Sequence, residues 1–256
     1  MSTLDRFSLK NKTVIVTGAS QGIGESISLG MAEAGANVVL AARNVEKLNT
    51  VGARIKALGA RCIKVKTDVL KRVDIEAMVQ AGVDEFGTVD CLVNNAGINL
   101  VKPALKITEE EWDAVLDTNL KAYFMCSQAA GRVMIENGGG SIINNASIFG
   151  IRGFPNLAAY ISSKGGVVQL TRGLAVEWAR KGIRVNCVAP GYTVTEMAKR
   201  DIESNPVILE QNLRKIPMKR GCDPREISDV MVFVASDAAS YLTGQIIAVD
   251  GGWSAF

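Results

Sequence analysis

The chain has 256 residues, of which 48% are hydrophobic and 21% charged, and its formal net charge is only +3. These values predict one globular domain over residues 1–256 with a large core, and no basic or basic–aromatic run indicates a nucleic-acid surface. The chain has no His, which excludes a Ser-His-Asp triad, a Cys-His pair and a His-ligated metal.

The N-terminal stretch MSTLDRFSLKNK is polar and lacks the apolar segment of a signal peptide. The longest apolar runs are strand-sized and too short to span a membrane. The five cysteines have no CxxC spacing, so they suggest neither a disulfide framework nor a zinc site. We therefore expect a soluble, cytoplasmic protein with reduced thiols, no metal, and no membrane or nucleic-acid partner.

Short β-branched runs alternate with longer helical patterns along the whole chain. Several of these runs are apolar on both faces, as in strands that helices cover on each side. Helical patterns between them include residues 24–35 and 110–137. This alternation predicts an α/β fold with a doubly wound, mostly parallel, seven-stranded sheet. The expected strands are 13–17, 37–42, 62–67, 91–95, 141–146, 184–189 and 245–250.

A glycine-rich turn, TGASQGIG (17–24), joins the first expected strand to a helix. Gly18, Gly22 and Gly24 let the chain turn sharply and let a ligand approach the backbone. The following helix would offer its free N–H groups to a pyrophosphate. Glu25 stands where a Walker loop needs Lys, which opposes an NTPase. A strand–helix turn without a ligand is the alternative, but the flanking elements favour dinucleotide binding.

The second expected strand ends in VVLAARN, where a dinucleotide fold usually places an acid for the ribose hydroxyls. Ala42 cannot accept from a 2′-hydroxyl, whereas the guanidinium of Arg43 suits a 2′-phosphate. The sequence therefore favours NADP(H) over NAD(H). Arg43 could instead be a solvated residue at a strand end, or an acid could come from elsewhere in the chain.

Tyr160 and Lys164 are four residues apart, so on a helix they share one face. A cation beside a phenol lowers the pKa of the phenol, and a positively charged oxidised nicotinamide would add to this effect. Such a pair can donate a proton to a carbonyl in a chain without His. Ser147, at the end of the fifth expected strand, could hydrogen-bond the same oxygen. Taken alone, a Tyr and a Lys at this spacing are usually surface neighbours.

Together these segments resemble the classical short-chain dehydrogenase/reductase family over nearly the whole chain. The matching segments occur in family order: TGASQGIG (17–24), TDV (67–69), NNAG (94–97), TNL around Asn119, Ser147, YISSK (160–164) and PGYTVTEM (190–197). The resemblance implies a catalytic tetrad of Asn119, Ser147, Tyr160 and Lys164. The cofactor contacts it implies, together with those predicted above, are Gly18, Ser20, Gln21, Gly22, Ile23, Gly24, Arg43, Asn44, Asp68, Val69, Asn95, Ala96, Gly97, Tyr160, Lys164, Pro190, Gly191, Thr193 and Thr195.

The implied reaction moves a hydride between NADP(H) and a ketone or secondary alcohol. Tyr160 would supply the proton, Ser147 would hold the oxygen, and Lys164 would lower the pKa of Tyr160 and bind the nicotinamide ribose. Asn119 would help to hold a water that links Lys164 to solvent. Two departures from the family pattern are the absence of a basic residue at Ser20-Gln21 and Ala146 where Ser is common.

The family leaves the substrate open. General similarity near the C-terminus and at ITEEEWDAVLDTNL favours a sugar acid or another small carbonyl compound. A 3-oxoacyl-carrier-protein reductase is the alternative, although MIENGGGS (134–141) offers no base to an acidic carrier. A nucleotide-sensing module without turnover is the other alternative, and the presence of both Tyr160 and Lys164 opposes it. The resemblance also implies a homotetramer or homodimer.

The least regular segment, at about 192–222, is expected to be a substrate loop. Arg152 could anchor a substrate carboxylate, although a solvated loop position is the plainer interpretation. Phe149, Phe154 and Tyr192 could shape an apolar pocket or could belong to the core.

Overall fold

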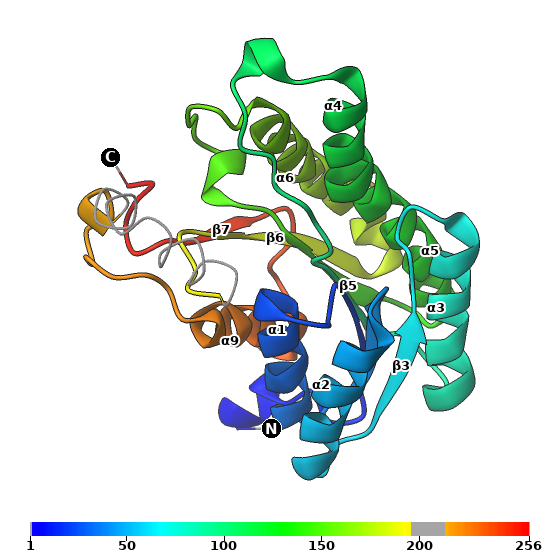
Figure 1. The fold of residues 1–256 in the computed structure, drawn as a ribbon. Coiled ribbons are helices and arrows are strands. Elements are labelled where there is room, and N and C mark those ends of the chain that lie inside the picture. Colours follow the sequence, from blue (N-terminus) through cyan, green and yellow to red (C-terminus); the bar gives the residue numbers. More distant parts are fainter. Residues whose placement is uncertain (1, 196–212, 256) are drawn as a thin grey trace.

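A seven-stranded parallel sheet forms the centre of the computed structural model, which describes residues 2–195 and 213–255 (Figure 1). The strand order is β3-β2-β1-β4-β5-β6-β7, and every neighbouring pair is parallel. This order confirms the doubly wound fold that the sequence predicts. The strands are β1 (Thr13–Thr17), β2 (Asn37–Ala42), β3 (Cys62–Lys66), β4 (Cys91–Asn94), β5 (Gly140–Asn145), β6 (Ile183–Pro190) and β7 (Ile246–Val249).

The central strands are apolar on both faces because helices cover both sides. All five residues of β1 are buried, whereas the edge strand β3 alternates between half-buried and exposed residues. The helices are α1 (Gly22–Glu33), α2 (Val45–Ala57), α3 (Arg72–Phe86), α4 (Glu109–Leu116), α5 (Ala122–Glu136), α6 (Ala158–Trp178) and α9 (Pro224–Ala235).

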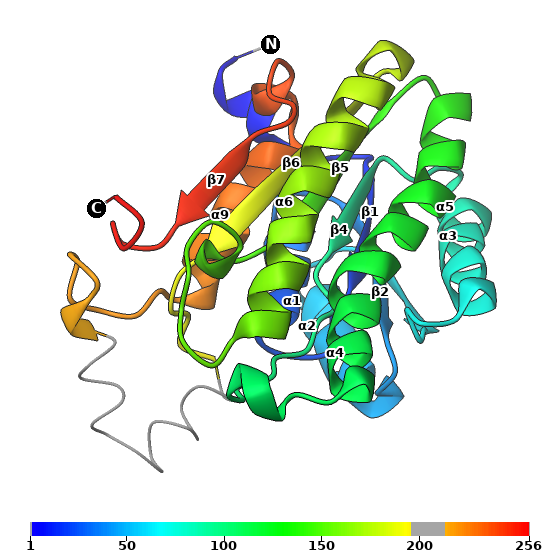
Figure 2. The same cartoon turned by 90° about the horizontal axis from the view of Figure 1, so that it is seen from above.

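Two helical layers enclose the sheet. Figure 2 shows α3, α4, α5 and α6 on one side and α1, α2 and α9 on the other. Met31 and Leu48 belong to the core under α1 and α2, whereas Met78 and Met134 belong to the core under α3 and α5. Within residues 2–195 and 213–255, no helix combines the length and the apolar character needed to cross a bilayer.

The order of the strands also places the residues predicted to form the site. Chain order runs outward in opposite directions from β1 and β4, which are neighbours in the sheet. In such folds a ligand binds beyond the carboxyl ends of the strands at this switch point. The glycine turn follows β1, Asn95 follows β4, Ser147 follows β5 and Gly191 follows β6. The segments that carry the family resemblance therefore meet at one edge of the sheet.

The helix expected over residues 110–137 is present from Glu109 to Glu136, but it contains a π-helical segment. This segment (Asp117–Lys121) lies between α4 and α5, with Asn119 at its centre. Sequence periodicity did not predict it, because the apolar pattern continues across it. A single π turn inside a helix is often found at a functional site.

Candidate active site

Glycines hold the turn between β1 and α1 against the loop after β4. Gly18 has a φ of 66°, and a Cβ there would lie 2.9 Å from the Cα of Ala96. A Cβ on Gly24 would collide with the carbonyl oxygen of Gly18. Gly22 also has a positive φ, 61°, but among residues 2–195 and 213–255 a Cβ there would meet only the side chain of Thr195, at 3.5 Å. Gly18 and Gly24 therefore close the turn, while Gly22 faces Thr195 beyond β6.

The start of α1 fits the pyrophosphate of a dinucleotide. Gln21 is the N-cap residue, and within the described residues its side chain makes no capping hydrogen bond. The first N–H groups of α1, near Ile23, thus remain available to an anion at the positive end of the helix dipole. Gly22 presents no side chain that would obstruct such a ligand. Ser20 precedes Gln21 in the same turn.

The loop after β4 is fixed to the glycine turn by hydrogen bonds. The side-chain amide of Asn95 donates to the carbonyl of Thr17 at 2.9 Å. The Thr17 hydroxyl accepts from the N–H groups of Asn95 and Ala96, at 2.9 and 3.1 Å. A Cβ on Gly97 would lie 3.1 Å from Oδ1 of Asn119. The structure therefore brings Asn95, Ala96 and Gly97 beside the turn and beside Asn119.

Arg43 and Lys47 are cations near the carboxyl end of β2, where Lys66 of β3 is the register partner of Ala42. Arg43 is exposed directly after the strand. Asn44 caps α2, because its Oδ1 accepts from the N–H of Lys47 at 3.0 Å. The ammonium of Lys47 donates to Oε1 of Gln21 in the glycine turn. Sequence reasoning missed both the capping role of Asn44 and the position of Lys47, since a Lys in the first turn of a helix carries no special signal.

Asp68 and Val69 follow the neighbouring strand β3. Oδ1 of Asp68 accepts from the N–H of Leu70 at 3.1 Å, and the N–H of Asp68 donates to Asp74 at 2.9 Å. Val69 packs at the border of the core under α3 and α5. Both residues therefore lie at the carboxyl edge of the sheet, next to the end of β2.

Ser147 and Tyr160 meet at the end of β5. Ser147 is buried, and its Oγ accepts from the N–H of Phe149 at 3.1 Å. That bond fixes the hydroxyl and leaves its proton available for donation. Burial raises the pKa of Tyr160, and a side-chain hydrogen bond with Ser147 acts in the opposite direction. The serine and the phenol are thus within reach of one acceptor oxygen.

Lys164 is buried beside them, with only 4% of its surface exposed. Its Nζ donates to the carbonyl oxygen of Asn145 at 2.7 Å and to the hydroxyl of Tyr123 at 3.3 Å. It lies 5.9 Å from the centroid of the Tyr160 ring. Burial lowers the pKa of Lys164 to about 8, because the charged form loses its hydration.

The pKa of Tyr160 differs from the sequence expectation. We expected Lys164 to lower it, but burial is the largest influence and raises the pKa above its ordinary value of 10.0. The hydrogen bond with Ser147 acts in the opposite direction without reversing the shift. The physical reason is that the half-buried phenol has lost part of its hydration, while the ammonium of Lys164 donates hydrogen bonds to Asn145 and Tyr123.

Asn119 anchors the π-helical segment to its surroundings. Its Nδ2 donates to the carbonyl of Ile98 at 2.9 Å and to the hydroxyl of Ser163 at 3.1 Å. Its Oδ1 accepts from the N–H of Ile98 at 2.8 Å. Ser163 in turn donates to the carbonyl of Tyr160 at 2.7 Å. The side chain of Asn119 therefore links the loop after β4 to the helix that carries Tyr160 and Lys164.

The segment after β6 closes the opposite side of the site. A Cβ on Gly191 would lie 2.7 Å from the Cα of Asp250, so this turn packs against the C-terminal segment. The hydroxyl of Thr193 donates to the carbonyl of Gly191 at 3.2 Å, and Thr193 forms an isolated β-bridge with Cys222. Pro190 ends β6. Of the expected substrate loop at 192–222, residues 196–212 lie outside the described residues.

The loop after Ser147 packs against the C-terminal segment. Phe149 and Phe154 contact each other and Trp253, with ring centroids 4.8 to 6.3 Å apart. Tyr192 packs on the border of this cluster. The guanidinium of Arg152 donates to the carbonyl of Trp253. That contact gives Arg152 a role in holding the loop to the C-terminal segment, in addition to the substrate anchor considered from the sequence.

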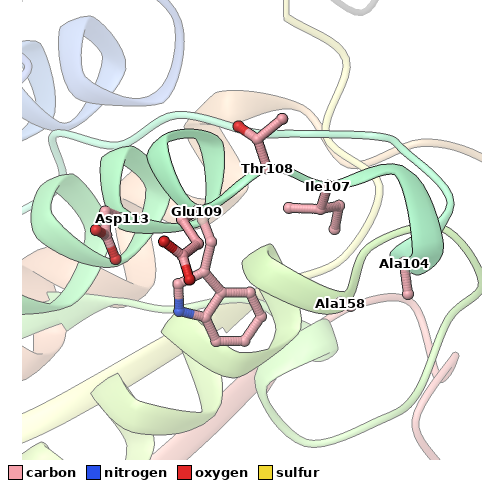
Figure 3. A pocket seen from close by; sticks show the side chains of 7 residues that line it. Ala104, Ile107, Thr108, Glu109, Asp113 and Ala158 are labelled. Carbon is pink, nitrogen blue, oxygen red and sulfur yellow. The ribbon is translucent and has the colours of Figure 1, made fainter.

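An open pocket of about 540 Å³ lies beside the starts of α4 and α6 (Figure 3). Its lining includes the Trp112 ring and the carboxylates of Glu109 and Asp113. Among the lining residues that the structure describes there is no cation and none of Asn119, Ser147, Tyr160 or Lys164. This pocket is therefore poorly suited to an anionic substrate, and the cluster of Ser147, Tyr160 and Lys164 lies elsewhere.

Comparisons with known proteins show the family to which the chain belongs. A family model described as enoyl-(acyl carrier protein) reductase matches residues 18–254. A 3-oxoacyl-(acyl-carrier-protein) reductase of Staphylococcus epidermidis is 42% identical over 94% of this chain and 98% of its own length. A 2-dehydro-3-deoxy-D-gluconate 5-dehydrogenase of Escherichia coli is 40% identical over 98% of this chain and 99% of its own length.

One solved structure aligns with this chain over the full length of both proteins. It is a gluconate 5-dehydrogenase of Burkholderia cenocepacia in complex with NADP and tartrate, 34% identical, with a TM-score of 0.94 and 100% coverage of each chain. The family model and these relatives span nearly the whole chain, and the segments that matched at the level of sequence meet at one edge of the sheet. The chain belongs to the short-chain dehydrogenase/reductase family and is an NAD(P)-dependent oxidoreductase.

Proposed function

We propose that the chain reduces the ketone of a small carboxylate-bearing compound, or oxidises the matching secondary alcohol, with NADP(H) as its cofactor. One observation carries this proposal: Tyr160, Ser147 and the buried ammonium of Lys164 gather at the carboxyl edge of the sheet that also bears the glycine turn. Such a site can give a proton to an oxygen while a hydride reaches the adjoining carbon.

The residues act on the substrate oxygen and on its proton. Ser147, with its lone pair engaged by Phe149, donates its own proton to the oxygen as negative charge develops. Tyr160 transfers its proton to the same oxygen, and Lys164 supplies a fixed positive charge beside the phenolate that remains. The nicotinamide, when bound, supplies or accepts the hydride. In the direction of oxidation the phenolate of Tyr160 removes the proton of the alcohol.

Asn119 acts indirectly in this proposal. Its Nδ2 and Oδ1 are engaged by Ile98 and Ser163, so the side chain holds the π-helical segment in place. A role in holding a water near Lys164 stays a prediction. The cofactor contacts predicted from the sequence stay predictions too, and the open start of α1 and the exposed Arg43 support them.

The preference for NADP(H) over NAD(H) rests on charge at the end of β2. Ala42 offers no acceptor to a ribose hydroxyl, Arg43 is exposed beside it, and Lys47 lies against Gln21 in the glycine turn. Two cations near one position favour an additional phosphate. The relative from Burkholderia cenocepacia that was crystallised with NADP supports the same choice.

A small hydroxy acid or keto acid is the substrate class that we favour. The gluconate dehydrogenases among the relatives act on sugar acids by their names, and the tartrate in one crystal is itself a hydroxy acid. The reductase of Staphylococcus epidermidis favours the alternative, a 3-oxoacyl group on an acidic carrier protein. The stretch 134–141 includes Glu136 and no Lys or Arg, which supports the small substrate over the carrier.

We also infer a homotetramer or homodimer in the cytoplasm. Phe124, Ile135 and Val176 expose large apolar side chains on α5 and α6, which suits contact with a second copy. All five cysteines are free, as reduced cytoplasmic thiols would be. A molar mass from light scattering tests the assembly.

The decisive experiment is a binding and turnover screen with the purified protein. Titration with NADPH and NADH, followed by protein fluorescence, should give the lower Kd for NADPH. Consumption of NADPH should then be fastest with keto derivatives of sugar acids and slower with 3-oxoacyl thioesters. A faster reaction with the thioesters would favour the carrier-protein reductase. Tight binding of NADPH without turnover of any carbonyl compound would favour a nucleotide-sensing module instead.

A further inference from the structure

Tyr123 is a second phenol in contact with the ammonium of Lys164. It lies in the first turn of α5, directly after the π-helical segment, and only 1% of its surface is exposed. Its hydroxyl lies 3.3 Å from Nζ of Lys164, and that nitrogen lies 5.0 Å from the centroid of the Tyr123 ring. Nothing in the sequence pattern distinguishes this residue, which occupies an apolar position in the helix.

The direction of the hydrogen bonds around Tyr123 follows from the number of protons. The Tyr123 hydroxyl donates its single proton to the carbonyl oxygen of Asn145, at 3.2 Å. Its oxygen must therefore accept from Lys164, which also donates to the carbonyl of Asn145 at 2.7 Å. Two of the three N–H groups of the ammonium are thus fixed, and the orientation of the third follows.

The surroundings keep Tyr123 neutral. Burial is the largest influence and raises the pKa of Tyr123 well above its ordinary value, and the nearby Tyr160, Cys187 and Cys126 act in the same direction. Tyr123 therefore does not exchange protons with the substrate near neutral pH. A buried hydroxyl is costly unless it is hydrogen-bonded, and a Phe would fill nearly the same volume at lower cost. The hydroxyl thus has a use beyond packing.

We propose that Tyr123 is a positioning residue for the reaction, which holds the ammonium of Lys164 in place and in its charged form through its hydroxyl and its ring. This inference rests on the proposed role of Lys164 beside Tyr160. The titratable groups that face Lys164 are Tyr123 on α5, Tyr160 on α6 and Cys187 on β6. Burial raises the pKa of Cys187 to about 12, so this thiol stays neutral near physiological pH.

The test compares Tyr123→Phe, which keeps the ring and removes the hydroxyl, with the wild-type protein. NMR of protein labelled at the lysine ε-carbon reports the pKa of Lys164 without any cofactor or turnover, and a Lys164→Met spectrum assigns the signal. Loss of an acceptor for the ammonium should lower that pKa by about one unit in Tyr123→Phe. Met134→Leu, a fully buried residue of the same helix, should leave it unchanged.

Kinetics supply the second measurement. For oxidation of the best alcohol, Tyr123→Phe should lower kcat about tenfold and move the rising limb of the pH profile to higher pH, because a less charged Lys164 supports the phenolate of Tyr160 less well. Tyr123→Met also loses the ring, so it should lower kcat further and move the rising limb to still higher pH. It serves in place of Tyr123→Phe if that variant does not fold.

An unchanged pKa of Lys164 and an unchanged pH profile in these variants would overturn the inference. So would a loss of kcat that merely follows a loss of Tm, as expected for packing alone. If the wild-type protein turned over no carbonyl compound, the proposed function would fail, while the titration of Lys164 would still decide the role of Tyr123.

Discussion

The turn after β1 and the cluster at the end of β5 lie at the same edge of the sheet, but they are built in opposite ways. The turn depends on missing side chains: Gly18 and Gly24 have no room for a Cβ, and Gly22 presents only backbone. The cluster depends on added polar groups, with the ammonium of Lys164 buried among Asn145, Tyr123 and Tyr160.

The difference shows which part of the site carries an energetic cost. Glycine adopts a positive φ without strain, so the glycine turn costs the folded state little free energy. A buried ammonium loses its hydration and recovers only part of it through hydrogen bonds. Substitutions in the glycine turn and in the polar cluster should therefore have opposite effects on stability.

The largest expected effect is the loss of turnover in Tyr160→Phe. In the proposed mechanism Tyr160 is the general acid, so the loss of its phenolic proton should lower kcat by about 10² to 10⁴-fold. The Kd for NADPH should stay close to that of the wild-type protein. Absorbance of NADPH during turnover and fluorescence titration measure the two quantities. Tyr241→Phe, at a fully exposed tyrosine, is the matched control. Near-normal turnover in Tyr160→Phe would refute its assignment as the acid.

The second effect concerns stability. Lowering the pKa of Lys164 from 10.5 to about 8 costs the folded protein up to about 3 kcal/mol while the lysine is charged. This cost is complete below pH 8, where both states carry the proton. It disappears between pH 8 and 10.5, because the folded state loses its proton first. Lys164→Met should therefore be the more stable protein at neutral pH, and its advantage should shrink as the pH rises toward 10.5.

Urea unfolding of both proteins across this pH range measures the difference. If the extra stability of Lys164→Met did not change with pH, the hydrogen bonds to Asn145 and Tyr123 would compensate fully for the lost hydration of the Lys164 ammonium. Loss of stability in Lys164→Met at every pH would contradict the contrast between the two sides of the site.

The contrast also explains what could be predicted from the sequence. The sheet and the glycine turn were predictable, because strand periodicity and glycine spacing act over a few neighbouring residues. The partners of Lys164 were not, because Tyr123 and Asn145 come from other elements and reach it only after the sheet has formed. The π-helical segment around Asn119 was missed for the same reason, since it is held by Ile98 and Ser163.

On the binding side, Gly24→Ala should be destabilising. Its new methyl group would collide with the carbonyl of Gly18. Adding a methyl group where there is no space typically lowers the free energy of unfolding by about 1 to 3 kcal/mol. Gly173→Ala, in the middle of α6 and with open space around its Cβ, is the control and should be neutral or stabilising. Thermal unfolding measures both. Equal Tm values for Gly24→Ala and the wild-type protein would show that the turn is less closely fitted than its geometry indicates.

The smallest effect is expected at the exposed end of β2, where charge rather than shape should select the cofactor. Arg43→Asp replaces a cation with an acid that can accept from a ribose hydroxyl, so the Kd for NADPH should rise about tenfold and that for NADH should fall. Arg180→Asp makes the same change of charge in an exposed residue just before β6, at the opposite edge of the sheet, and should alter neither Kd. If Arg43→Asp keeps the wild-type preference, Lys47 beside Gln21 and Lys66, the register partner of Ala42, are the residues to replace next. A preference that survives all three substitutions would mean that the cofactor is not chosen by charge at this strand end.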